Sequence, residues 1–173
     1  HLIAIRENPQ DIGAYIGVAN LYTLVGDNIN ALRYLNRARL MEATNPQVLQ
    51  LIARNTIWRG DINSGLERYW ELINAAPTNL NTYLEAGKIA AWSGFFGASE
   101  QYYLAGLNNF PDESELLANL AFTYLWGNQE QRARETFQRA EQRAMSPEQI
   151  VQLGRVYVLN EDLPRAEQLY RDG

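Results

Sequence analysis

The chain has 173 residues, of which 46% are hydrophobic and 20% are charged, and its formal net charge at pH 7 is −5. This composition is typical of a folded protein and excludes an intrinsically disordered chain. The absence of cysteine excludes disulfides, thiolate nucleophiles and cysteine-ligated metals, and the only histidine is His1.

Positive charge is not concentrated enough to predict a nucleic-acid interface. The densest arginine group lies between residues 132 and 143, where Glu135 and Glu141 are interleaved with it. This pattern is typical of a solvated helix face with ion pairs, so we expect no nucleic acid among the partners. No apolar run has the length needed to cross a bilayer, so we expect that this segment does not span a membrane.

Residues 1–11 precede the first complete repeat. Leu2, Ile3, Ala4 and Ile5 are apolar and Pro9 follows them, which is typical of the end of a helix. We interpret residues 1–11 as the tail of an earlier, truncated repeat.

From Ile12 onward the sequence repeats with a period of about 34 residues. Gly26-Asp27 and Gly60-Asp61 are 34 residues apart, Gly94 follows at the same interval, and Gly127-Asn128 comes one residue short of it. These marks predict four repeats and an incomplete fifth, at residues 12–45, 46–79, 80–113, 114–146 and 147–173. The first residue of each repeat is called position one below.

Small residues recur where two helices of a repeat must approach each other closely. Position eight is always Ala or Gly, position twenty is Ala, Gly or Ser, and position twenty-four is Leu, Tyr or Phe. Apolar residues three or four apart predict two helices per repeat, joined by a turn whose Asp or Asn caps the second helix. No alternating strand pattern is present, so we expect an all-α fold.

This pattern resembles the tetratricopeptide family over nearly the whole chain. The family has small residues at positions eight, twenty and twenty-seven, aromatic residues at eleven and twenty-four, and proline at thirty-two. Position eleven is Tyr22, Tyr124 and Tyr157 here, whereas Thr56 and Ala90 depart from the family pattern. The resemblance implies an all-α, right-handed superhelix, or solenoid, of helical hairpins whose first helices line a concave surface.

The resemblance also assigns candidate partner-binding residues to that concave surface, at positions six, nine and thirteen of the repeats. They are Asn20, Arg54, Trp58, Lys88, Trp92, Asn119, Phe122, Trp126 and Arg155.

Two interpretations of the three tryptophans at position thirteen stay open. In the first interpretation, the tryptophans cover the junction between repeats, since tryptophan is seldom wholly exposed. Alternatively, they form a stacking track for sugar rings or an extended peptide, with the cations of Arg54, Lys88 and Arg155 beside it.

The sequence lacks the residue sets that catalysis requires. No histidine-based acid/base pair, Ser-His-Asp set or glycine-rich phosphate loop can be assembled, so we expect no enzymatic activity, no cofactor and no metal. Some family members hold a peptide's terminal carboxylate with a Lys/Asn clamp. Ile16 and Leu51 occupy two of the places that this clamp would need beside Asn20.

The phrase Ala91-Trp92-Ser93-Gly94, echoed around Trp58 and Trp126, resembles tetratricopeptide arrays that precede the outer-membrane barrels of bacterial exopolysaccharide exporters. It implies a scaffold in the periplasm of a Gram-negative bacterium that binds a protein partner, such as a polysaccharide-modifying enzyme. Two alternatives are a conduit whose tryptophans contact the polysaccharide directly, and a tetratricopeptide adaptor in the cytoplasm.

Overall fold

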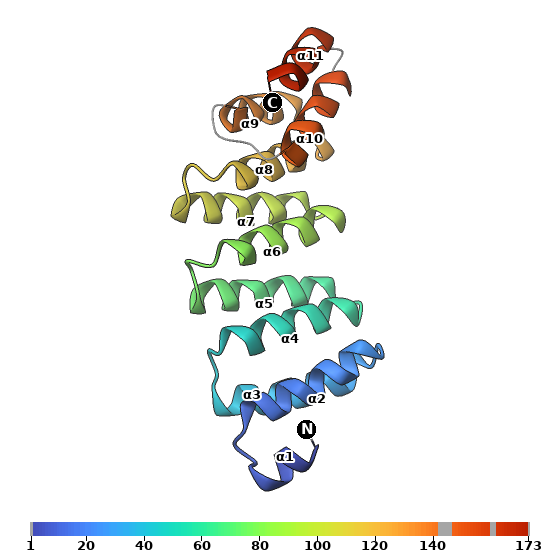
Figure 1. Ribbon diagram of the computed structural model, residues 1–173, viewed down its shortest axis with the longest axis vertical. Coiled ribbons are helices and arrows are strands. Elements are labelled where there is room, and N and C mark those ends of the chain that lie inside the picture. The colour runs from blue at the N-terminus through green and yellow to red at the C-terminus, as the bar shows by residue number, and fades with distance from the viewer. Residues whose placement is uncertain (1, 142–146, 160–161, 173) are drawn as a thin grey trace. The chain divides into compact units, whose positions relative to one another are not determined.

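The computed structural model describes residues 2–141, 147–159 and 162–172, which form helices and contain no strand (Figure 1). The predicted all-α fold of tetratricopeptide-type hairpins is confirmed. The helices are α1 (Leu2–Glu7), α2 (Ile12–Leu24), α3 (Asn28–Met41), α4 (Pro46–Trp58), α5 (Ile62–Ala75), α6 (Leu80–Trp92), α7 (Phe96–Asn109), α8 (Ser114–Trp126), α9 (Glu130–Glu141), α10 (Pro147–Leu159) and α11 (Leu163–Asp172).

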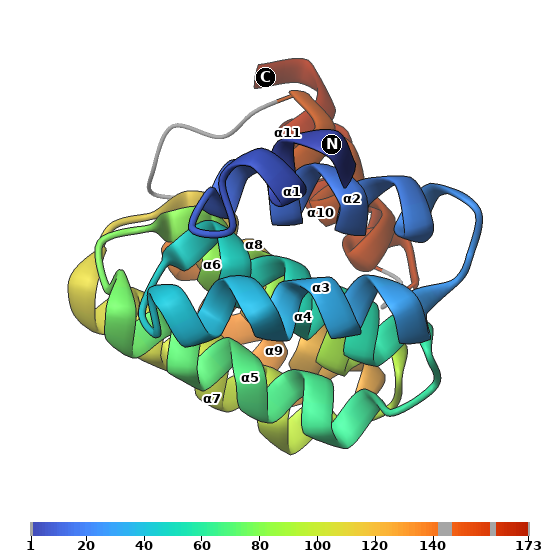
Figure 2. The same cartoon turned by 90° about the horizontal axis from the view of Figure 1, so that it is seen from below.

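The chain forms two compact units, residues 1–82 and residues 83–173, and the boundary between them falls within α6. Unit 1 holds the hairpins α2–α3 and α4–α5, and in each the two helices lie side by side (Figure 1 and Figure 2). Unit 2 holds most of α6 and the helices α7 to α11.

The turns between first and second helices depend on one residue with a left-handed backbone. Gly26, Gly60 and Gly94 have φ angles of 78°, 99° and 80°. The next amide reaches back to the preceding helix, as when Asp27 N–H donates to the Tyr22 carbonyl over 2.9 Å. This is the arrangement in which glycine ends a helix without a Cβ penalty.

In the turn between α8 and α9, Asn128 does not cap the second helix as the sequence predicted. Asn128 itself is left-handed, with φ of 57°, whereas Gly127 has φ of −82°. Asn128 therefore replaces the turn glycine, 34 residues after Gly94, and is not the residue that caps α9. The expected caps are confirmed at Asp27 and Asp61, whose carboxylates accept backbone N–H bonds of 3.0 and 3.2 Å.

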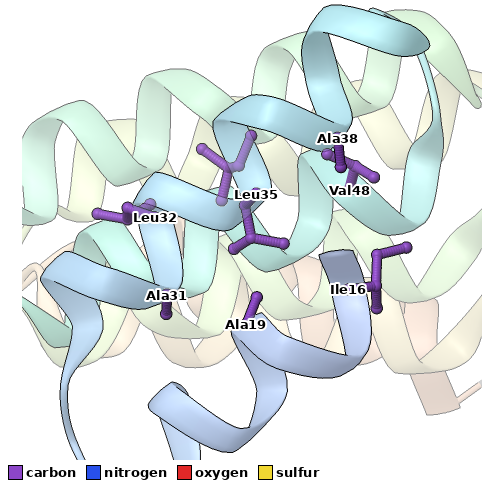
Figure 3. Packing of buried hydrophobic residues seen from close by; sticks show 8 residues of the cluster. Ile16, Ala19, Ala31, Leu32, Leu35, Ala38 and Val48 are labelled. Atoms are coloured by element: carbon purple, nitrogen blue, oxygen red, sulfur yellow. The ribbon is translucent and has the colours of Figure 1, made fainter. Parts of the chain in front are cut away.

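In unit 1, the core forms where α2, α3 and α4 meet (Figure 3). Ala19 and Ala31, at positions eight and twenty, are fully buried, so the backbones of α2 and α3 approach closely. Leu35, at position twenty-four, is also fully buried and packs in the same cluster as Val48 of α4. Small residues at the crossing thus leave room for one large side chain to fill the space between helices.

In unit 2, glycine at position eight makes room for an aromatic ring at position twenty-four. A Cβ atom on Gly87 would overlap the Tyr103 ring, and one on Gly154 would overlap the Tyr170 ring. Only 1% of the Tyr103 surface is exposed, so its ring is enclosed on all sides. Burial also raises the pKa of Tyr103 well above its usual value.

We predict that Gly87→Ala lowers the free energy of unfolding by about 1–3 kcal/mol, because the enclosed Tyr103 ring cannot move away from the new methyl group. Urea denaturation followed by circular dichroism measures this. The matched control is Gly97→Ala in α7, where a Cβ meets nothing within 4 Å. That variant should be as stable as the parent or up to about 1 kcal/mol more stable. Equal stability of both variants would contradict the packing described for Tyr103.

We predict that Asn128→Gly stabilises the protein by up to about 1 kcal/mol and that Asn128→Val destabilises it by about 1–2 kcal/mol. The reason is the left-handed backbone at this residue, which glycine adopts freely and valine does not. The control is Asn20→Gly, an exposed site within α2, where glycine should lower stability. A destabilising Asn128→Gly exchange in the same urea experiment would show that φ is not the controlling factor.

Candidate functional site

The first helices end in large apolar side chains that remain exposed. The exposed fractions are 57% for Trp58, 76% for Trp92 and 47% for Trp126. In unit 1, Leu24 occupies the same position of α2 and is 83% exposed. Each of these residues is the last of its helix, because the left-handed turn begins two residues later.

Further exposed apolar side chains of unit 1 lie within five residues of Leu24 in the sequence. Leu21, Val25 and Ile29 are all more than half exposed. The end of α2 is tied to α4 by Thr23, whose hydroxyl donates to the Asn55 Oδ1 over 2.8 Å. The sequence analysis did not name these residues; the available signal was the mostly apolar run from Leu21 to Val25 that continues beyond the end of α2.

In unit 2, Trp126 and Trp92 differ in how far they are packed. The Trp126 ring lies 6.0 Å from the Phe122 ring, which in turn meets Phe137 edge-on at 5.1 Å. Trp126 therefore combines a packed face with an exposed one. Trp92 exposes three quarters of its surface, and Phe95 just beyond the turn is 39% exposed. Packing accounts for little of the Trp92 side chain.

Two predicted binding residues of unit 2, Lys88 and Asn119, both contact Glu115, which the sequence analysis did not name: Lys88 contacts its carboxylate and Asn119 its backbone. Lys88 Nζ lies 2.9 Å from the Glu115 Oε1, and the Asn119 amide donates to the Glu115 backbone carbonyl over 2.7 Å. The positive charge of Lys88 is thereby compensated within the protein. Arg155 is exposed, but no described contact joins it to this group.

The other predicted polar residues lie in unit 1. Asn20 is exposed on α2, and Arg54 is half-buried on α4. They share this unit with Trp58, whereas the remaining candidates belong to unit 2.

A second polar group in unit 2 joins α7, α8 and α9. The Tyr124 hydroxyl donates to the Glu100 carboxylate over 3.1 Å and accepts from Arg132 over 2.7 Å. The Arg132 guanidinium lies 4.0 Å from the centre of the Tyr124 ring and also pairs with Glu100. Burial, with the Glu100 charge beside it, raises the pKa of Tyr124 to about 12. The hydroxyl is therefore neutral at physiological pH and is held by both charged partners.

Within residues 2–141, 147–159 and 162–172, no three acidic or histidine side chains gather as a metal ion would require. In the same part of the chain, no helix has both the length and the apolar character of a membrane span.

Comparison with known proteins shows a likeness of fold. No protein-family model matches the chain, and no curated protein matches it in sequence. Among solved structures, residues 41 to the end of MamA from Desulfovibrio magneticus RS-1 superpose with a TM-score of 0.68 at 18% identity, covering 93% of this chain and 92% of that one. The RS-1 MamA double mutant ArsTM gives 0.69 at 17% identity, covering 92% and 90%. A further MamA crystal structure gives 0.65 at 12% identity, covering 80% and 81%. MamA is a helical, tetratricopeptide-like protein, and this chain shares that fold.

We predict that Trp92→Ala changes the free energy of unfolding by no more than about 0.5 kcal/mol, because the side chain is mostly exposed. Trp126→Ala should cost about 1–2 kcal/mol, roughly half the loss expected for a fully buried tryptophan, since its ring packs on Phe122. Urea denaturation of the two variants in parallel measures the difference. If Trp92→Ala costs as much as Trp126→Ala, the Trp92 ring is a packing element after all.

Proposed function

We propose that this chain is a non-catalytic, tetratricopeptide-type scaffold that binds a protein partner through the exposed ends of its first helices. The observation that carries the proposal is the exposure of Trp58 and Trp92. An exposed indole keeps a large apolar surface in water, and covering it with a partner releases that free energy. Tryptophan is also among the residues that contribute most to binding at protein interfaces.

The polar groups of the structure support a scaffold rather than an enzyme. Glu100, Tyr124 and Arg132 are hydrogen-bonded to one another, Arg132 also donates to Gln129, and Tyr124 keeps its proton at physiological pH. A catalytic base or nucleophile needs a group that is poised to exchange a proton with a substrate. The likeness of fold to MamA agrees with a tetratricopeptide-type interaction scaffold.

A direct polysaccharide contact is the second candidate function, and the open indole faces favour it. Flat aromatic faces bind sugar rings by stacking, and Trp92 offers most of its surface for such contact. Because Lys88 is already paired with Glu115, this candidate favours a neutral polymer over an acidic one at unit 2.

A finer proposal concerns the setting of this scaffold. The phrase Ala91-Trp92-Ser93-Gly94 supports a place in the periplasm of a Gram-negative bacterium, where the scaffold would hold a polysaccharide-modifying enzyme beside an exopolysaccharide exporter. The alternative is a cytoplasmic adaptor. The encoded full-length chain distinguishes them: a signal peptide upstream and alternating strands downstream are expected of the exporter, and their absence would favour the adaptor.

Site-specific photo-crosslinking tests the scaffold in the organism that makes it. A crosslinking amino acid in place of Trp92 should capture one predominant protein, and the same group at Asn108, exposed on the second helix α7, should capture it far less. Trp58→Ala should reduce the yield if both units contact that partner.

The polysaccharide alternative is tested by titrating neutral and acidic oligosaccharides while following tryptophan fluorescence. A saturable change that Trp92→Ala abolishes, together with no protein crosslink at Trp92, would replace the protein scaffold with the polysaccharide conduit. A flat titration together with a specific crosslink is the outcome that the scaffold proposal expects.

A further inference from the structure

Unit 1 contains a polar cavity of about 200 Å³ where α3, α4 and α5 meet. Its apolar part is formed by Leu32 and Ile52, both of which are buried. The polar part includes the side chains of Asn36, Arg59 and Arg68. A cavity of this volume accommodates several water molecules or one small polar group with a short aliphatic stem.

The cavity lies where the second repeat, residues 46–79, departs from the repeat pattern at position eleven. In unit 2, this position of α8 carries Tyr124, whose ring is 4% exposed and fills the space between neighbouring second helices. In unit 1, the same position of α4 carries Thr56, which lines the cavity. A hydroxyethyl group leaves open the volume that a tyrosine ring would occupy.

The helices that precede α4 and α8, which are α3 and α7, also differ at position twenty-one. One of them carries a charged side chain there and the other does not. In unit 2 it is Glu100, whose carboxylate accepts hydrogen bonds from Arg132 and from the Tyr124 hydroxyl. In unit 1 it is Leu32, which contributes no acceptor. In unit 2 this place is filled by Tyr124 with Glu100 and Arg132, whereas the arginines of the cavity in unit 1 come from other positions, fourteen and twenty-three.

The arginines of the cavity keep hydrogen-bond donors for a ligand. Arg68 pairs with Glu71 through Nη1, and Arg59 lies 3.5 Å from Asp61 through Nη2. The other guanidinium nitrogens of Arg59 and Arg68 have no partner among the residues that the structure describes. Each guanidinium carries five N–H groups, so one ion pair leaves most of them available.

The remaining N–H donors of the two guanidinium groups, rather than the net charge of the lining, favour an anion. Two arginines and one aspartate give the lining a formal charge of +1, and Glu71, which pairs with Arg68 from outside the lining, offsets that charge. The one acid of the lining, Asp61, is committed to capping α5, where it accepts the Ser64 N–H over 3.2 Å. Hydrogen bonds from Ser64, with the nearby charge of Arg59, lower the pKa of Asp61, so it stays ionised and does not compete as a proton donor.

We propose that this cavity binds a carboxylate carried on a short aliphatic stem. Arg59 and Arg68 hold the carboxylate oxygens through charge-assisted hydrogen bonds, and the stem lies against Leu32 and Ile52. The two sources of such a group are a glutamate or aspartate side chain of a polypeptide and a free small carboxylic acid. The proposal does not depend on the exposed tryptophans, because none of them lines the cavity.

The test is a titration of the intact chain, followed by the NMR signals of the arginine Nε–H groups in buffer of low ionic strength. The probes are the blocked peptide Gly-Glu-Gly, its Gly-Gln-Gly counterpart and free glutarate. We expect the glutamate peptide or glutarate to shift the signals of Arg59 and Arg68 saturably, and the glutamine peptide to leave them unchanged. Binding by the glutamate peptide identifies a side-chain ligand, and binding by glutarate alone identifies a free acid.

Three variants separate the cavity from general attraction to surface arginines. Arg68→Gln should weaken binding about tenfold, the loss of one charge-assisted contact. Arg134→Gln, at an exposed arginine of α9, should leave the affinity unchanged. Thr56→Tyr should abolish binding by filling the cavity, provided that its circular dichroism spectrum matches the parent's. Equal binding of the glutamine peptide, equal loss in the Arg68 and Arg134 variants, or no binding by any probe would overturn the proposal.

Discussion

The close approach of two helices at paired small residues is the constraint on which the rest of this structure depends. Ala19 and Ala31 have no exposed surface, and Gly87 leaves no room for a Cβ beside Tyr103. Because the backbones of the two helices lie close together there, one large side chain at position twenty-four fills the space between a hairpin and the next helix. The first helices α2, α4, α6 and α8 also span the same thirteen positions of their repeats, and each ends two residues before a left-handed turn residue.

Positions away from that crossing vary from repeat to repeat, as position eleven of α4 and α8 shows. At position eleven, the Tyr124 ring supports a network with Glu100 and Arg132 that ties three helices together. Thr56 at the same position supports no such network and opens a cavity beside Arg59 and Arg68. The same backbone therefore supports a buried tyrosine network in one unit and, in the other, a cavity beside two ion-paired arginines that keep further N–H donors.

The ends of the first helices lie outside the crossing as well, which explains why apolar residues there remain exposed. A helix that stops at a left-handed turn has no following turn of its own to cover its last side chain. Leu24, Trp58 and Trp92 thus present apolar surface on rigid elements, where covering it with a partner disturbs no internal packing. Lys88 shows the opposite case, since Glu115 already neutralises it.

The sequence by itself determined the period, the all-α class and the pairing of small with large positions, because these depend on spacing within one repeat. It also led to one wrong assignment. Gly127 comes one residue short of the period, which suggested a shifted turn, but Asn128 adopts the left-handed backbone of the turn glycine and keeps the period. Only the tertiary structure decided how far each tryptophan is exposed, that Lys88 pairs with Glu115, and that Thr56 leaves a cavity. Lys88 and Glu115, for example, are 27 residues apart and lie on different helices. A repeat pattern specifies which helices meet without specifying which side chains they bring together.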